Sequence, residues 1–286
     1  MLFVKQTRKA CLVAVLVGAY AAPSHGNATV LSGTSEAYGE SISLTATLLG
    51  SDTNLVSGPT PTATGTAPGA YNVTNSAASL LVNVLGGLLG SLSTDALTAS
   101  ASSTVTGLPG AATTIGSASV QNLSAHLLSV LGLSVTEIAS SATITGDYGA
   151  LVAVGTTTIM GLVLNGLSLS EPLSPNYVLL NASGVKVTLA EQLALGDGIS
   201  SAGMIVNAID VQFTDALANL GSGGLYSLNG QIIFGHSSAS ETATPDTVAA
   251  PEPGSAAILA GSLSMFGLLR ARVAGGVRNW RKGSRA

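Results

Sequence analysis

Charged side chains, cysteine and tryptophan are scarce in this sequence of 286 residues. Charged residues make up 8% of the chain, which is about a third of the usual share. Hydrophobic residues make up 46%. Because disordered chains are polar and highly charged, this composition excludes an intrinsically disordered protein. It predicts one large folded domain or two small ones, with a core of Val, Leu, Ile and Ala.

Basic side chains are almost missing from the middle of the chain. Lys186 is the only Lys or Arg between residues 27 and 250, and the same segment holds thirteen Asp and Glu, a formal charge of −12. A body with this charge repels phosphate backbones, so nucleic-acid binding is excluded as a function. The other basic residues lie close to the two ends of the sequence.

The first 26 residues have the organisation of a secretory signal peptide. A basic segment precedes an apolar run, residues 10–22, which is too short to span a bilayer, and small residues follow it. We predict cleavage after Gly26 and export of the remaining chain. Cys11 lies in the apolar run, so the exported protein has no cysteine. This excludes a disulfide scaffold, a Cys-ligated metal and a thiol nucleophile.

A second apolar run, residues 254–269, lies near the C-terminus and carries no charge. As a helix it would measure roughly 24 Å, slightly less than a hydrocarbon core of about 30 Å. Basic residues directly after a membrane span hold that side in the cytoplasm. In this chain they are Arg270, Arg272, Arg278, Arg281, Lys282 and Arg285. We therefore predict a transmembrane helix over 254–269 with a cytoplasmic basic tail.

The order of these C-terminal parts carries a resemblance. Pro251, Glu252 and Pro253, followed by the apolar run and the basic end, resemble the PEP-CTERM sorting signal. The resemblance implies that residues 251–286 are recognised by an exosortase, a membrane-embedded cysteine protease of exopolysaccharide-producing Gram-negative bacteria. It implies signal peptidase and exosortase as partners during sorting, a precursor anchored in the inner membrane, and a final place at the cell surface or in the extracellular matrix.

Strand patterns dominate the segment between the two ends. Residues 40–48 alternate apolar and hydroxyl side chains, residues 203–213 alternate with one phase slip that suggests a bulge, and residues 230–237 form a third apolar segment. We predict a secreted all-β domain over 27–240, a two-layer antiparallel β-sandwich, with a β-solenoid as the alternative. Residues 241–250 are small and polar and are predicted to be a linker.

Shorter patterns support the same fold. Asn165-Gly166 and Asn229-Gly230 are dipeptides typical of hairpin turns. The Ser/Thr-rich segments 102–107, 141–146 and 156–161 resemble one another and are predicted to be strands of one sheet with their hydroxyls facing outward. Two Leu-rich runs, 79–92 and 123–133, fit either helices or buried strands.

The body as a whole resembles the secreted choice-of-anchor P proteins. The resemblance covers roughly residues 36–240 and is carried by segments such as "SSATITGDYGALVAVGTTTIMGLVLNG" and "VLLNASGVKVTLAEQ". Members share a body and vary in their attachment signal, of which a PEP-CTERM tail is one. No enzymatic role or ligand is established for that family, so the resemblance implies no catalytic residue.

Few residues of the body offer catalytic chemistry. A hydroxyl nucleophile needs a neighbouring base, and the only histidines are His126, which lies in a Leu run and is expected in a core or interface, and His236, which is expected to be exposed. No G-x-S-x-G motif occurs. The acidic residues could supply a carboxylate pair to a secreted hydrolase acting on polysaccharide, but the body has no Trp platform for sugars.

Aspartates near turn glycines are the candidates for a cation site. Carboxylate oxygens suit Ca²⁺, and this makes Ca²⁺ a possible ligand although no D-x-D-x-D loop is present. The candidates are Asp147, Asp197, Asp210 and Asp215. The hypothesis that fits the whole sequence is an exported, exosortase-sorted, non-catalytic protein of the cell surface or exopolysaccharide matrix, with an adhesive role. The alternative is the carboxylate-pair hydrolase.

Overall fold

The computed structural model describes residues 28–245, apart from 49, 85, 88, 129–130, 170–173 and 220–224. All of these lie in one compact unit, Asn27–Asp246. The signal peptide predicted over 1–26, the motif Pro251-Glu252-Pro253, the span predicted over 254–269 and the basic tail lie outside the described residues. Within the described residues no helix has the length and apolar character to cross a membrane.

The unit is all-β, and its strands form two open antiparallel sheets. The strands are β1 Thr29–Leu48, β2 Ser51–Ala67, β3 Tyr71–Ala77, β4 Leu80–Val84, β5 Gly90–Thr94, β6 Leu97–Ser103, β7 Ala112–Leu127, β8 Leu131–Gly146, β9 Val152–Met160, β10 Val163–Leu164, β11 Leu167–Ser168, β12 Tyr177–Ala182, β13 Val185–Gly196, β14 Ser201–Asn219 and β15 Leu225–Thr244.

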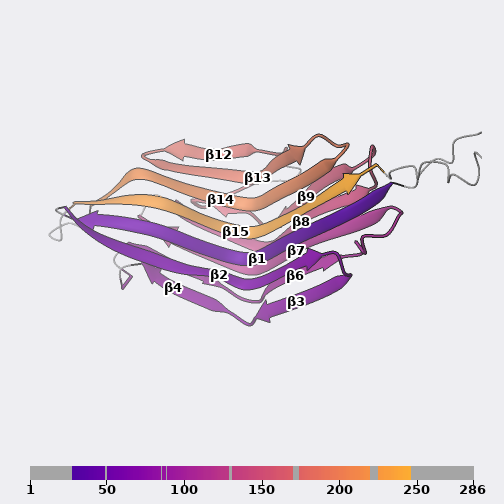
Figure 1. The fold of residues 1–286 in the computed structure, drawn as a ribbon. Helices are drawn as coiled ribbons and strands as arrows, with labels where there is room; N and C mark the ends of the chain where they lie inside the picture. The colour runs from indigo at the N-terminus through magenta and orange to yellow at the C-terminus, as the bar shows by residue number, and fades with distance from the viewer. Residues whose placement is uncertain are drawn as a thin grey trace, which may run out of the picture. The chain divides into compact units, whose positions relative to one another are not determined.

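Sheet A has the order β12-β13-β14-β15-β1-β2 and sheet B the path β11-β10-β8-β7-β5-β4, with β9 paired to β8 and β6 joining β3 to β7. In Figure 1 sheet A faces the viewer and sheet B lies behind it. Strands β1, β14 and β15 of sheet A pack on β6 to β9 of sheet B. The predicted sandwich architecture is thus present, and the long hairpins of both sheets differ from the coils of a solenoid.

A line of small residues crosses sheet A at mid-length. Gly39, Gly235, Ala208 and Ala190 lie side by side on β1, β15, β14 and β13 and are left out of the pairing between these strands. On β14 the buried side chains are even-numbered before this line, as at Val206, and odd-numbered after it. One extra residue in each strand reverses which residues point inward. We call this line the crease.

Sheet B reverses its alternation in the same way. Asn122 of β7 and Thr136 of β8 are left out of the pairing between those strands. On β7 the next buried residue after Val120 is Leu123, and on β8 the next after Val135 is Ile138, so the buried positions change parity in both strands. Asn122 has a φ of 49°, in the left-handed region that asparagine tolerates better than most residues. Both layers of the sandwich are therefore divided into two halves.

The two halves have different cores. One half is filled by large side chains, including Phe234, Ile42, Leu92, Leu133 and Ile138. The other half is filled mainly by Ala, with Val30, Val105, Val206, Ile144 and Met204. Small side chains hold the two sheets closer together than large ones. The Ala-rich half is therefore the thinner part of the sandwich.

The strand predictions are largely confirmed. Ile42, Leu44 and Ala46 are buried in β1 as the alternation of 40–48 requires, and the phase slip predicted in 203–213 falls at Ala208. Ile205 faces outward, because the inward positions before the slip are those of Val206 and its even-numbered neighbours. The Leu-rich runs form strands: 79–92 contains β4 and the start of β5, and 123–133 contributes to β7 and β8.

Two predictions about local structure are corrected. Asn165-Gly166 is a two-residue hairpin turn between β10 and β11 with φ values of 49° and 83°, but Asn229-Gly230 lies inside β15, where it pairs with β1. Asn-Gly makes a turn only where the chain has room to reverse, and here neighbouring strands occupy both sides. Strand β15 also continues to Thr244, so the sheet takes in four residues predicted to belong to the linker 241–250.

The two sheets approach each other closely at Gly116, in the Ala-rich half. A Cβ atom at this position would lie 2.5 Å from the backbone oxygen of Ser238 and 2.7 Å from that of Glu36, both in sheet A. Backbone atoms cannot move aside as a flexible side chain does. Gly116 is therefore required by the spacing of the layers.

We predict that Gly116→Ala lowers the free energy of unfolding by about 1–3 kcal/mol, the usual cost of overpacking. Urea denaturation of the full-length protein measures the change. Gly203→Ala is the matched control, since its Cβ would meet no atom nearer than the Leu195 side chain at 3.2 Å. An equal loss of stability in both variants would contradict the close approach at Gly116.

Two carboxylates lie buried between the sheets. Glu40 is 0% exposed and its carboxylate has no hydrogen-bond partner, while Glu241 is 1% exposed and has the Thr114 hydroxyl beside it. Burial disfavours the charged form, and it raises the pKa of both groups, that of Glu40 to about 7. Because the folded state then binds a proton that the unfolded state releases near pH 4.5, stability falls as the pH rises from about 4.5 to 7.

We predict that Glu40→Gln removes this part of the pH dependence. As the pH rises from 4.5 to 7.5, the free energy of unfolding of the variant should increase by about 3 kcal/mol relative to that of the unchanged protein. The estimate follows from 1.36 kcal/mol for each unit by which the pKa of Glu40 is raised. Chemical denaturation at a series of pH values gives the difference directly. Asp52→Asn, which changes an exposed carboxyl, serves as the control. If stability depends on pH in the same way in Glu40→Gln and in the unchanged protein, the carboxyl of Glu40 is not buried.

Candidate carbohydrate-binding face and a polar cluster on the opposite sheet

The outer face of sheet B carries a regular array of hydroxyl groups. Alternate residues of β3, β6, β7, β8 and β9 point outward, and the register places them in rows across the five strands. One row is Thr74, Ser100, Ser117, Ser141 and Thr156; the next is Ser76, Thr98, Ser119, Ala139 and Thr158. The strands that carry these side chains lie about 4.8 Å apart, and residues on one face of a strand recur about every 6.8 Å along it.

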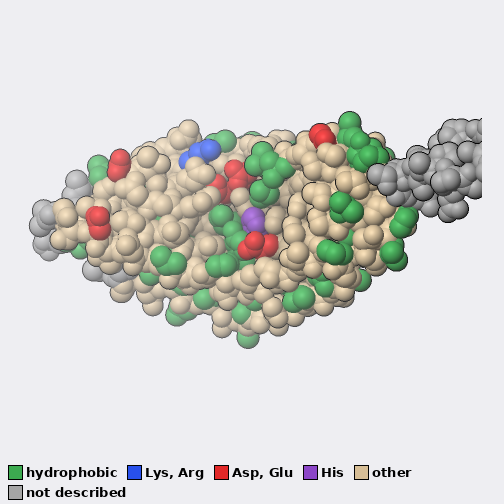
Figure 2. Space-filling view, in the orientation of Figure 1, with side chains coloured by type: hydrophobic (Ala, Val, Ile, Leu, Met, Phe, Trp, Pro, Cys, Tyr) green, Lys and Arg blue, Asp and Glu red, His purple; other side chains and the backbone are tan. Residues whose placement is uncertain are grey.

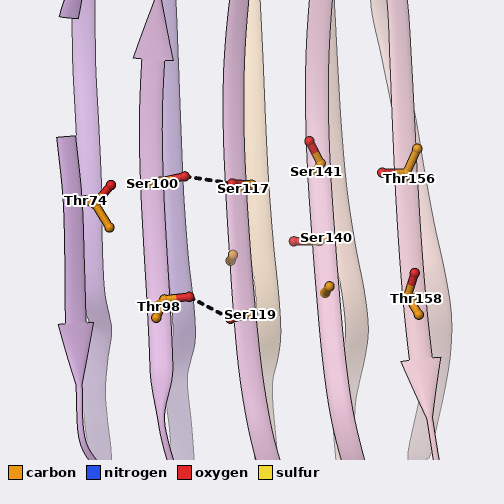
Figure 3. A pocket seen from close by; sticks show the side chains of 11 residues that line it. Thr74, Thr98, Ser100, Ser117, Ser119, Ser140, Ser141, Thr156 and Thr158 are labelled. Atoms are coloured by element: carbon orange, nitrogen blue, oxygen red, sulfur yellow. Dashed lines mark hydrogen bonds between the residues drawn. The ribbon is translucent and has the colours of Figure 1, made fainter. Parts of the chain in front are cut away.

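This array lines an open groove of about 500 Å³. Figure 3 shows the two rows of hydroxyl side chains lying across neighbouring strands, with two of the pairs joined by hydrogen bonds. Ser100 Oγ lies 2.7 Å from Ser117 Oγ, and Thr98 Oγ1 lies 2.6 Å from Ser119 Oγ. The groove lining contains only Ser, Thr and Ala, so the contacts that it offers are uncharged.

Hydrogen bonds between paired hydroxyls fix the orientation of side chains in the array. Each hydroxyl has one hydrogen to donate and two lone pairs to accept, so a pair satisfies part of this capacity and leaves the rest open to a ligand. Side chains as short as Ser and Thr lose little rotamer freedom when they are fixed. We call this groove the hydroxyl groove. The prediction of outward hydroxyls on one sheet is confirmed for 141–146 and for Thr156 and Thr158 of 156–161, but the hydroxyl of Thr157 is buried. It is wrong for most of 102–107, because β6 ends at Ser103, which is itself buried.

The outer face of sheet A is different, because ionisable side chains gather near the crease. Figure 2 shows this face as mostly uncharged, with a histidine and several acidic side chains around its hollowed middle. We call Glu36, Tyr38, Glu191, Asn207, Asp210 and His236 the His236 cluster. Neighbouring strands bring them together: Tyr38 pairs with His236, His236 with Asn207, and Asn207 with Glu191.

A chain of hydrogen bonds fixes His236. Asn207 Nδ2 donates to Glu191 Oε2 over 2.6 Å, and His236 Nδ1 lies 2.7 Å from Asn207 Oδ1. Because an amide oxygen can only accept, Nδ1 of His236 carries the hydrogen. The ring of His236 stacks on that of Tyr38 with centroids 4.3 Å apart. Nε2 is left as a free acceptor with no partner among the described residues.

Burial shapes the titration of this cluster. It lowers the pKa of His236 to about 4, so the ring is neutral at physiological pH. Burial, together with the nearby charges of Glu36 and Asp210, raises the pKa of Tyr38 to about 12. Burial also raises the pKa of Asp210, against the hydrogen bonds that Gln231 and Gln212 donate to its two oxygens, each over 2.7 Å.

The histidines exchange the environments expected of them. His126 is exposed on β7, because it alternates with the buried Ala125 and Leu127. His236 is partly buried, and it lies in the middle of β15 rather than near its end. The sequence contains no local signal for the His236 cluster, because its members come from four strands far apart in the chain. Only strand register unites them.

The four aspartates considered for Ca²⁺ are not brought together. Asp147 lies in the turn after β8, Asp215 bonds to Ser227 and Asn229, and Asp210 belongs to the His236 cluster. Asp197 accepts backbone N–H groups from Ser201, Ile199 and Ser200, which lower its pKa. Among the described residues no three His, Cys, Asp or Glu side chains form a group suited to a metal.

Comparisons with protein-family models, with curated proteins and with solved structures find no match to this chain. The geometry of the two outer faces is therefore what bears on function.

We predict that the imidazole of His236 remains a neutral Nδ1–H tautomer down to about pH 4. Nitrogen-15 NMR of histidine-labelled protein distinguishes the two ring nitrogens and follows their titration. The exposed His126 provides the internal comparison in the same sample. Asn207→Asp should remove the preference, because a carboxylate favours the charged ring, and a His236 signal that titrates near pH 6.5 in the unchanged protein would contradict its burial.

Proposed function

We propose that this chain is an exported, non-catalytic protein of the cell surface or exopolysaccharide matrix that binds neutral polysaccharide through the hydroxyl groove. The observation that carries the proposal is the two-dimensional register of Ser and Thr across five strands of sheet B. Rows of donors and acceptors at a constant spacing suit a ligand that itself repeats hydroxyl groups along its length. An extended glycan chain is such a ligand.

The character of the groove supports weak, adhesive binding. Its lining has neither an ionisable side chain nor an aromatic platform. Each net hydrogen bond contributes only about 1 kcal/mol, so useful affinity requires many contacts along one chain or many copies of the protein along one polymer. A matrix protein meets both conditions, and this favours an adhesive role over turnover of the polymer.

The termini complete the proposal. We propose that the chain is exported with a signal peptide over 1–26 and sorted by an exosortase that reads Pro251, Glu252 and Pro253. The span over 254–269 and the basic tail hold the precursor at the inner membrane until the body is released to the surface. A body related to the choice-of-anchor P proteins, in which the attachment signal varies, fits this arrangement.

The groove is tested by removing hydroxyls without changing side-chain shape. In the triple variant Thr98→Val, Thr156→Val, Thr158→Val, affinity for insoluble neutral polysaccharide should fall about a hundredfold, from roughly 1 kcal/mol per lost contact. Co-sedimentation with the polymer measures it. The control replaces Thr34, Thr45 and Thr47, whose hydroxyls are exposed on sheet A. Unchanged binding in the groove variant would refute the assignment.

The sorting proposal is tested by mass spectrometry of the protein released at the surface of an exosortase-containing host. Peptides from the body should be abundant, and peptides after Pro253 should be missing. Replacement of Pro251, Glu252 and Pro253 by Ala should leave the uncleaved precursor in the membrane fraction. Detection of a peptide containing Trp280 in the released protein would overturn processing at this motif.

A further inference from the structure

The hydroxyl groove is longer across the strands than along them. Its outward-facing lining residues come from five neighbouring strands, β3, β6, β7, β8 and β9, but from only two rows. Five strands span roughly 19 Å at a separation of about 4.8 Å, whereas two rows on one face lie about 6.8 Å apart. An elongated ligand that fills the groove therefore lies across the strands.

Rows that contain larger side chains border the groove on both sides. The bordering row on one side contains Ile115 and Val154, and the row on the other side contains Gln121, Glu137 and Met160. Val154 and Met160 are 46% and 45% exposed, so their side chains stand beside the groove. Because the Ser, Thr and Ala side chains between these rows are shorter, they form the floor of a channel whose axis runs across the strands.

One of the two rows presents a hydroxyl on every strand of the groove. Its members are Thr74, Ser100, Ser117, Ser141 and Thr156 (Figure 3). Ser100 and Ser117 bond to each other, while the hydroxyls of Thr74, Ser141 and Thr156 bond to no residue in the described part of the chain. These three keep their full capacity to donate and accept. We call this row the uninterrupted row.

The period of the uninterrupted row matches that of an extended glycan ribbon. One pyranose of a chain with equatorial linkages advances by nearly one strand separation, about 4.8 Å. Successive sugars of such a ribbon are turned over, so the ribbon repeats after two sugars. Neighbouring strands of the groove are antiparallel, so the row repeats after two strands. A helical glycan, whose linkages bend the chain, loses this register after a few sugars.

We propose that the groove binds a neutral glycan of the extended ribbon type, with its axis across the strands and one sugar over each of the five strands. This assignment rests on the proposed binding of neutral polysaccharide and specifies which class of polymer is bound. Hydroxyls on one edge of the ribbon bond to the uninterrupted row, and those on the other edge bond to the second row. On β8 the second row has a methyl group, that of Ala139, in place of a hydroxyl.

Calorimetric titration of the full-length protein with the series from cellobiose to cellohexaose tests the number of sugars bound. Each added sugar up to the fifth should strengthen binding about fivefold, from roughly 1 kcal/mol per hydrogen bond. Cellohexaose should then bind no more than about twofold better than cellopentaose. Affinity that stops rising at two or three sugars would overturn the assignment of one sugar to each strand.

Maltohexaose is the matched control for the shape of the glycan. It contains the same sugars as cellohexaose, with a linkage that curls the chain. It should bind about tenfold more weakly or less, because the loss of one or two hydroxyl contacts weakens binding by that order. Equal affinity for the two hexamers would overturn the ribbon assignment.

Threonine variants test the direction of the chain. Thr74→Val and Thr156→Val remove the hydroxyls at the two ends of the uninterrupted row, on β3 and β9, and each should lower the number of sugars at which affinity levels off from five to four. Thr145→Val removes an outward hydroxyl of β8 beyond the groove and should leave the affinity unchanged. Weaker binding of cellohexaose in Thr145→Val, with no change in the other two variants, would place the glycan along the strands and overturn its orientation.

Co-sedimentation with insoluble neutral polysaccharide separates the ribbon assignment from glycan binding itself. Protein that sediments with the polymer but binds cellohexaose and maltohexaose equally would overturn the ribbon assignment and leave the proposed function in place. Protein that binds neither the insoluble polymer nor any of the soluble oligomers would overturn both.

Discussion

The reversal of inward and outward positions at the crease is the constraint on which both outer faces depend. A strand with uninterrupted alternation has one inward set of residues along its whole length. Here one residue per strand is left out of the pairing at Gly39, Gly235, Ala208 and Ala190. The inward set therefore changes parity in neighbouring strands at the same place. Without this agreement, one strand would present its core residues to solvent.

The crease also separates two kinds of packing. Large aliphatic side chains fill one half of the sandwich, while alanines and Gly116 allow close approach of the layers in the other. Short core side chains are matched by short surface side chains, since the hydroxyl groove lies over β6 to β9 where the buried neighbours include Ala99, Ala101, Ala118 and Ala142. The scarcity of charge and aromatics in the sequence thus reflects a thin, flat structure and not a poorly formed core.

Local alternation was enough to predict the class of fold. Residues 40–48 and 203–213 showed both the strands and the phase slip, because burial of every second residue is a local property. The Leu-rich runs stayed ambiguous, since apolar residues on both faces leave no period to measure. The hairpin turn predicted at Asn229-Gly230 was wrong, because neighbouring strands flank the dipeptide on both sides and its turn propensity has no effect there. The predicted C-terminal end of the domain, residue 240, was four residues too early, because the Ser and Thr residues at the end of β15 resemble a linker in composition.

The candidate sites were harder to predict for a different reason. The hydroxyls of 141–146 and 156–161 were visible in the sequence, but their alignment with Thr74, Ser100 and Ser117 depends on the register of five strands. The His236 cluster joins residues from Glu36 to His236, and no spacing in the sequence relates them. Charge scarcity was the one usable signal: where few ionisable groups exist, any that meet in three dimensions are informative.

The first and last strands of the unit lie side by side, and this decides how the protein bears mechanical load. β1 begins and β15 ends at the same end of sheet A, and β15 is bonded along most of its length to β1 on one side and β14 on the other. A force that pulls on the chain after Thr244 while a polymer holds one of the broad faces acts along β15. The ladder bonds lie across that direction, so they resist in parallel and yield together. A pull that separates the two ends of the unit would instead open β1 from β15 one pair at a time. A tether at the C-terminal end alone therefore loads the sandwich in its stronger direction.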